Sequence, residues 1–84
     1  MNEKEIAISL VRNGIAKQRS SPNEYTEANE DESIRSLGNA TIANSLEFLG
    51  KHGVVSDVQP TFSHRGIGFA YRISQPLVEE LSND

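Results

Sequence analysis

Residues 37–73 constrain the fold of this 84-residue chain more than any other stretch, because glycines and apolar spacing divide them into a helix and a hairpin. Ile42, Leu46 and Leu49 recur at the spacing of one helix face, and Gly53 provides a helix stop. Apolar residues then alternate with small or polar ones, which is the period of a half-buried strand. The sequence therefore predicts a helix over 40–52 that leads directly into two antiparallel strands.

The predicted strands run from Val54 to Thr61 and from Ile67 to Ile73, with a polar tip at 63–66 between them. Because proline cannot donate to a sheet ladder, Pro60 is expected at an edge or near the tip. The simple alternation of a strand predicts that one face of the first strand carries Val54, Val58, Pro60 and Phe62.

Two helices are expected before this stretch. Asn2 and Glu5 form a capping-box-like start for a helix over 3–17, and Asn29 with Glu32 gives a capping signal for a short helix over 30–37. Gly38 ends the short helix and leaves a tight joint of the helix-turn-helix kind. Between the helices, residues 21–26 are compatible with a helix start, a short turn, or a brief strand around Tyr25 and Thr26.

The first helix carries apolar residues on more than one face. One stripe contains Ile6, Leu10 and Gly14, and Ile8 and Ile15 fall on a second side. The second side predicts a homodimer through helix 1 (Ile8, Ile15) and through a C-terminal helix formed by Leu77, Val78 and Leu81. The alternative is that Ile8 packs beneath the C-terminal segment of the same chain.

The size of the chain predicts a single domain over 1–84. It contains no cysteine, so neither disulfides nor thiolate metal sites can stabilise it. No apolar run approaches the roughly 18 residues that a membrane span needs, and the first residues lack the apolar region of a signal peptide. These features predict a cytoplasmic location.

The formal net charge of −4 is unevenly distributed. Residues 24–32 hold five carboxylates and 75–84 hold three, whereas 1–23 and 33–74 each have a net charge of +2. An acidic protein of this kind can still present a basic face to nucleic acid.

The segments TIANSLEFLGKHGVV (41–55) and HRGIGFAYRIS (64–74) resemble the ends of MarR-, PadR- and ArsR-type regulators. The resemblance covers residues 34–75 and implies an α+β, winged helix-turn-helix fold. Such a fold has three helices, a β-hairpin wing and a short C-terminal helix. The helix-turn-helix would span 30–53, and the wing 54–73.

The resemblance also implies a small transcriptional regulator that binds double-stranded DNA as a dimer. The helix at 40–52 would enter the major groove, and the wing tip at 63–66 would lie on the minor groove or backbone. The residues implied near base edges are Asn39, Thr41, Asn44 and Ser45, and those near phosphate or at the wing tip are Arg35, Lys51, His52, His64 and Arg65.

Other classes of function have less support from the residues. Ser63 and His64 are neighbours whose side chains diverge in a strand, and the two histidines with Asp57 lack a familiar zinc spacing, so neither an enzyme nor a metal site is expected. No cofactor motif is present either. The alternative is a winged-helix module for protein contact, which would use the acidic surface 24–32 and exposed Phe48 and Phe62.

Overall fold

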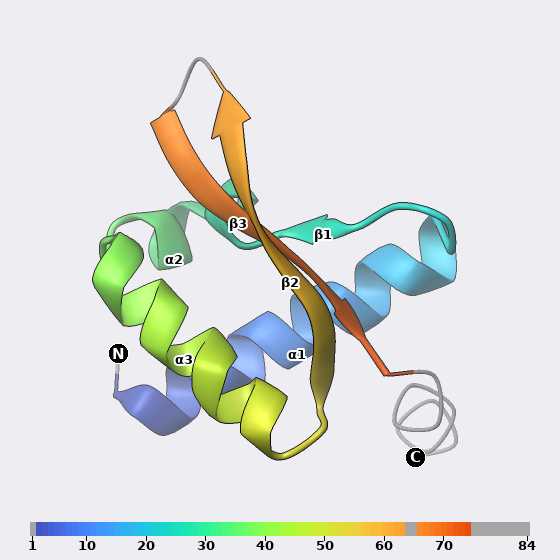
Figure 1. Ribbon diagram of the computed structural model, residues 1–84, viewed down its shortest axis with the longest axis horizontal. Helices are drawn as coiled ribbons and strands as arrows, with labels where there is room; N and C mark the ends of the chain where they lie inside the picture. The colour runs from blue at the N-terminus through green and yellow to red at the C-terminus, as the bar shows by residue number, and fades with distance from the viewer. Residues whose placement is uncertain (1, 64–65, 75–84) are drawn as a thin grey trace.

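The structure is a computed structural model that describes residues 2–63 and 66–74. Over these residues the chain forms three α-helices, one 3-10 turn and a three-stranded antiparallel sheet (Figure 1). The elements in chain order are α1 (Glu3–Ser20), β1 (Thr26–Glu27), η1 (Ala28–Glu30), α2 (Glu32–Arg35), α3 (Asn39–Lys51), β2 (Val55–Ser63) and β3 (Gly66–Ile73).

The sheet has the strand order β1-β3-β2, so the strand that precedes α2 and α3 pairs with the second strand of the hairpin. Helix, strand, two helices and a hairpin in this arrangement form a winged-helix-like topology. The α+β class and the hairpin after α3 are thus confirmed. Figure 1 shows the strands of the hairpin crossing the helices, with the end of β2 projecting beyond them.

The core lies between the helices and one face of the sheet. Leu10 of α1, Ile34 of α2 and Ile42 of α3 have no exposed surface, and Tyr71 and Ile73 of β3 meet the same cluster. The Tyr71 hydroxyl donates to the carbonyl oxygen of Leu10 at 2.6 Å. This bond satisfies the one polar group of a buried side chain and ties α1 to the middle of β3.

Helix α1 starts as predicted, because the Asn2 side chain accepts a hydrogen bond from the Glu5 backbone N–H at 2.9 Å. It continues to Ser20, three residues beyond the predicted end. Ile15 is 9% exposed and belongs to the core of the single chain, whereas Ile8 is 40% exposed. Only Ile8 of the two therefore has substantial surface on a second face of α1.

The region predicted as one helix over 30–37 is split into η1 and the four-residue α2. Only Ala28 and Ile34 are buried there, which gives too little apolar periodicity for a longer helix. Asp31 starts α2 by accepting hydrogen bonds from Ser33, and its other carboxylate oxygen accepts from the Asn13 side chain. Hydrogen bonds from Asn13 and Ser33 favour the ionised form and lower the pKa of Asp31.

The predicted row Val54, Val58, Pro60 and Phe62 is wrong, because β2 contains a bulge. The register with β3 shifts by one residue between Ser56 and Gln59, where Asp57 has a φ of 52°. The extra residue reverses which positions face the helices. Val55 is therefore the buried valine, Val58 is 42% exposed, and Pro60 and Phe62 lie opposite Phe69 and Ile67 on the same face as Val55.

Two predicted features lie outside the described residues: the helix containing Leu77, Val78 and Leu81, and the wing-tip pair His64 and Arg65. Among the helices that the structure does describe, none has the length and apolar character to cross a membrane.

Candidate functional site

The first half of β3 is joined to the start of α3 by two asparagines. Asn29 of η1 donates from its side-chain nitrogen to the Asn39 side-chain oxygen at 3.2 Å. The Asn29 oxygen accepts the backbone N–H of Phe69 at 3.2 Å, and the Asn39 nitrogen donates to the carbonyl oxygen of Ile67 at 3.0 Å. We call this arrangement the asparagine bridge (Asn29, Asn39). It fixes the position of the hairpin relative to α3.

The asparagine bridge also completes the edge of β3. Strand β1 is only two residues long and pairs with Ala70 and Tyr71. Beyond its ends, side chains take its place: Asn29 accepts from the Phe69 N–H, and Gln18 of α1 accepts from the Ile73 N–H. Since unpaired strand edges promote aggregation, these side chains protect β3 where β1 does not reach.

Gly68 allows Asn29 to approach the strand. A Cβ atom at this position would lie 2.7 Å from the Asn29 side-chain oxygen and 3.1 Å from the Thr61 hydroxyl oxygen. Any larger residue would therefore displace Asn29 from its hydrogen bonds. The glycine in the predicted second strand has a packing role at the asparagine bridge.

The face of α3 that points away from the core carries four exposed residues: Ala40, Asn44, Glu47 and Lys51. The Lys51 ammonium lies 3.6 Å from the Glu47 carboxylate, and both side chains are about two-thirds exposed or more (73% and 66%). An exposed pair of this kind is weak and can rearrange when a ligand arrives. Asn39 is not part of this face, since both ends of its amide are bound in the asparagine bridge.

Thr41, Ser45 and Phe48 lie on the flank of α3 that faces α1. Ser45 is only 8% exposed, which removes it from the face that a DNA ligand would meet. Its spacing of three residues after Ile42 and four before Leu49 is the sequence signal that predicts this burial. Phe48 is 56% exposed and packs beside His52, with ring centres 4.6 Å apart.

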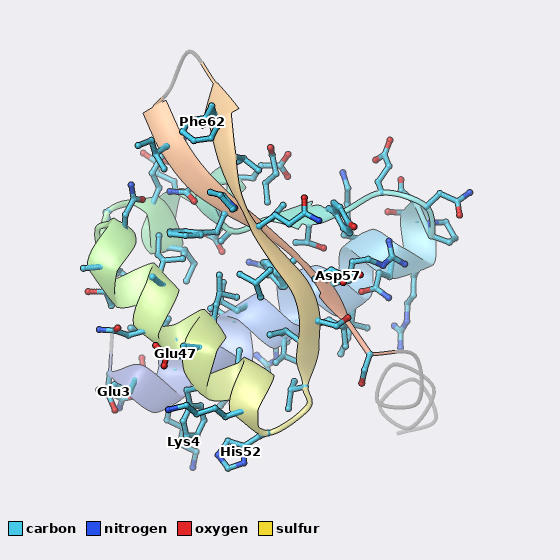
Figure 2. All side chains as sticks on the ribbon, in the orientation of Figure 1. Glu3, Lys4, Glu47, His52, Asp57 and Phe62 are labelled. Carbon is cyan, nitrogen blue, oxygen red and sulfur yellow. The ribbon has the colours of Figure 1, made fainter. Side chains whose placement is uncertain are left out.

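A groove of about 590 Å³ runs between α1 and α3. Its apolar surface comes from Ala7, Ile8 and Phe48, and its polar rim includes Glu3 and Lys4, with Thr41, Asn44 and Ser45 on the α3 side. Figure 2 places Glu3, Lys4, Glu47 and His52 at the opposite end of the molecule from Phe62 of the wing. The groove and the wing are thus separate surfaces.

Arg35, predicted to contact the DNA backbone, is exposed at the end of α2. It lines a smaller hollow of about 220 Å³ beside the start of β3, together with Asn39, Thr61, Ile67 and two carboxylates, Glu27 and Glu30. The hollow therefore has mixed charge rather than a purely basic lining.

Two of the five carboxylates in the acidic segment 24–32 have internal partners. The Glu24 carboxylate lies 3.3 Å from the Lys17 ammonium, and Asp31 caps α2. Arg72 of β3 donates to the carbonyl oxygens of Pro22 and Glu24, and its guanidinium lies 5.7 Å from the centre of the Tyr25 ring. No local pattern predicts this long-range role of Arg72, which holds residues 22–25 against the sheet.

No group of three or more His, Asp or Glu side chains that could hold a metal ion occurs within residues 2–63 and 66–74. Comparison of the chain with protein-family models, with curated proteins and with solved structures gives no match. The function must therefore be argued from the surfaces described above.

Proposed function

We propose that this protein binds double-stranded DNA through the exposed face of α3 and the hairpin wing, as a small transcriptional regulator. The observation that supports this proposal is the asparagine bridge. It holds the wing beside the start of α3 and leaves the opposite face of that helix open. In winged-helix proteins that bind DNA, a helix in the major groove and a neighbouring hairpin must act as one rigid unit.

In this arrangement α3 lies in the major groove and Asn44 is the principal base-reading residue. Its amide is exposed, and asparagine can pair with adenine through two hydrogen bonds. Thr41, which is half-buried, contributes its methyl group or hydroxyl at the groove wall. Lys51 and Arg35 contact phosphates on either side, and the predicted minor-groove contacts of His64 and Arg65 complete the interface.

The affinity of one protomer is expected to be low and strongly dependent on salt. Each neutralised phosphate contributes about −0.9 to the slope of log affinity against log salt. Few cations are available, and Glu47 lies on the interface itself. A dimer doubles the number of Lys and Arg side chains that can neutralise phosphates. This is a physical reason to expect the homodimer through helix 1.

Fluorescence anisotropy with duplex DNA, titrated over salt, tests the proposal. We expect binding that weakens steeply with salt and falls about tenfold in Asn44→Ala, since a bidentate base contact contributes roughly 1–3 kcal/mol. The control is Asn23→Ala, an exposed asparagine in the turn after α1. The absence of binding at the lowest salt, with the protein folded, would exclude this function.

Glu47→Gln is expected to raise the affinity for DNA several-fold. The substitution removes a negative charge from the proposed interface and releases Lys51, whose ammonium lies 3.6 Å from that carboxylate. Glu5→Gln, an exposed site on α1, is the control because it changes the net charge equally. If both variants gain equally, the effect comes from net charge and α3 does not face the phosphates.

The homodimer is proposed through Ile8 of α1. An exposed isoleucine beside an apolar groove favours burial against a second copy. We expect Ile8→Asp to shift the sedimentation of the protein at micromolar concentration from dimer to monomer, while the circular dichroism spectrum is unchanged. A wild-type protein that sediments only as a monomer would contradict the proposal.

The second candidate is a module for protein contact, and the groove between α1 and α3 is the observation that favours it. Apolar grooves rimmed by polar residues are typical of protein-binding sites. The acidic segment 24–32 is a weaker candidate surface, because Glu24 and Asp31 already have internal partners. Phe48→Ala distinguishes the candidates: a protein-contact module loses its partner, whereas DNA binding through Asn44 persists.

A further inference from the structure

Within residues 2–63 and 66–74, no element covers the core-facing row of the sheet where it continues onto the wing. Tyr71 and Ile73 are buried, Phe69 is half-buried, and Ile67 is 55% exposed. Phe62 lies directly opposite Ile67 and is 77% exposed. Because opposite residues in antiparallel strands share a face, Phe62 and Ile67 form an apolar pair on the core-facing side of the sheet. We call them the wing pair (Phe62, Ile67).

Phe62 lies on the part of the hairpin that projects past the helices (Figure 2), and Ile67 lies opposite it, where its carbonyl oxygen accepts from Asn39 at the start of α3. Burial decreases steadily from Ile73 toward this end of the sheet. Both side chains keep more than half of their surface exposed, so they gain less from folding than the buried residues of β3 do.

The charge of the hairpin favours an anionic ligand. The chain holds twelve carboxylates, yet none occurs in residues 58–78, where the charged residues are Arg65 and Arg72. Ile67 also lines the hollow beside the start of β3, to which Glu27 and Glu30 contribute carboxylates and Arg35 a guanidinium. Beyond Asp57 of the bulge, the strands of the hairpin carry no carboxylate.

The outer edge of the hairpin disfavours strand pairing with a second copy. Pro60 has no N–H to donate, and the bulge at Asp57 bends β2, both of which are devices that block edge-to-edge association. Pairing of the β2 edge with a second copy is therefore disfavoured. A ligand that contacts the face of the hairpin is favoured instead.

We propose that the wing pair is an apolar wedge that enters the minor groove of DNA and partly unstacks one base step, while α3 lies in the adjoining major groove. The inference rests on the proposed function. Phenylalanine and isoleucine are side chains that minor-groove proteins insert between bases, and insertion bends the duplex toward the major groove. Because pyrimidine–purine steps unstack easily, the wedge gives the protein a preference for TA or CA steps under the wing.

The test uses a short duplex that contains TA steps, with donor and acceptor dyes on its ends and 2-aminopurine at one adenine. Binding of the wild-type protein should increase energy transfer, as the ends approach, and increase 2-aminopurine fluorescence, as the base unstacks. Phe62→Ala should lose both signals and bind about tenfold more weakly, whereas Phe62→Leu should retain most of the bend. Since Phe62 is largely exposed, both variants are expected to fold, which circular dichroism verifies.

Val58→Ala is the matched control, because Val58 is also an exposed apolar residue of β2 but lies at the bulge, away from the wing pair. It should leave both signals unchanged. If Phe62→Ala binds and bends DNA like the wild type, the wedge is excluded while the proposed function stands. If Phe62→Ala weakens binding but the wild type produces neither signal, insertion is likewise excluded.

Two further outcomes assign the wing pair to another ligand. Loss of a dimer in Phe62→Ala, with unchanged DNA bending, would overturn the wedge and indicate contact with a second copy. Binding to anionic lipid vesicles that Phe62→Ala abolishes, again with unchanged bending, would overturn it in favour of a membrane surface. If the wild-type protein binds no duplex at low salt, the proposed function and the wedge fail together.

Discussion

Replacing Gly14 by alanine should lower the free energy of unfolding by about 1–2 kcal/mol, although the same change in most helices increases stability. Gly14 lies in the middle of α1, where the helix crosses β3. A Cβ atom there would lie 2.5 Å from Ile73 Cγ1, 2.8 Å from Ile73 Cδ1 and 3.2 Å from Tyr71 Cε2. Both neighbours are buried, so relief requires movement of the helix or repacking of the core.

Gly50→Ala provides the matched control. Gly50 is also within a helix, but it is exposed, and its added Cβ would meet only Val55 Cγ2 at 4.0 Å. We expect this variant to gain up to about 1 kcal/mol from helix propensity alone. Urea denaturation followed by circular dichroism measures both changes. Equal stabilisation of the two variants would show that α1 does not pack against β3 at the distance found here.

The elements around residues 37–73 were predictable from the sequence because local signals agree there. Leu46 and Leu49 mark the buried face of α3, Gly38 has the positive φ of 90° that a glycine permits, and strand β3 follows its predicted range within one residue. Where periodicity, turn residues and length all indicate one structure, little depends on distant contacts.

The bulge at Asp57 was not predictable, since aspartate in a strand gives no sign that an extra residue will be inserted. Because the bulge shifts the register by one residue, the residues of β2 before Asp57 face the side opposite to the predicted one. Val55 is therefore buried where Val54 was predicted to be. The predicted helix over 30–37 is longer than α2 for a similar reason: one capping signal and one buried isoleucine do not define a length. Burial of Ser45, by contrast, follows from its helical spacing and could have been found.

Part of the candidate site depends on contacts between residues far apart in the chain. Asn29 and Phe69 are forty residues apart, and Arg72 and Pro22 are fifty apart. No periodicity links such pairs, so a sequence without tertiary information predicts Asn39 as a surface residue when both ends of its amide bind the protein itself. Exposure of Asn44, Lys51 and Phe62 agrees with the predicted surface positions.

Asn29→Ala should have the largest combined effect on stability and on DNA affinity. The substitution leaves the partly buried N–H of Phe69 without its acceptor and the Asn39 oxygen without its donor. An unsatisfied group of this kind costs about 1–3 kcal/mol, so a clear fall in the urea midpoint is expected. Hydrogen exchange of the Phe69 amide should accelerate more than that of Tyr71, which β1 covers.

Asn29→Ala should lower the affinity for DNA because Asn29 positions the wing, and not because Asn29 contacts the DNA. Without the asparagine bridge, the wing is no longer held at a fixed angle to α3, and the two parts of the interface bind less cooperatively. Asn44→Ala separates this role from base contact, because it should weaken DNA binding with little change in stability or in Phe69 exchange. Asn23→Ala should change none of the three. If Asn29→Ala accelerates Phe69 exchange but leaves DNA affinity intact, the bridge stabilises the fold and has no part in the interface.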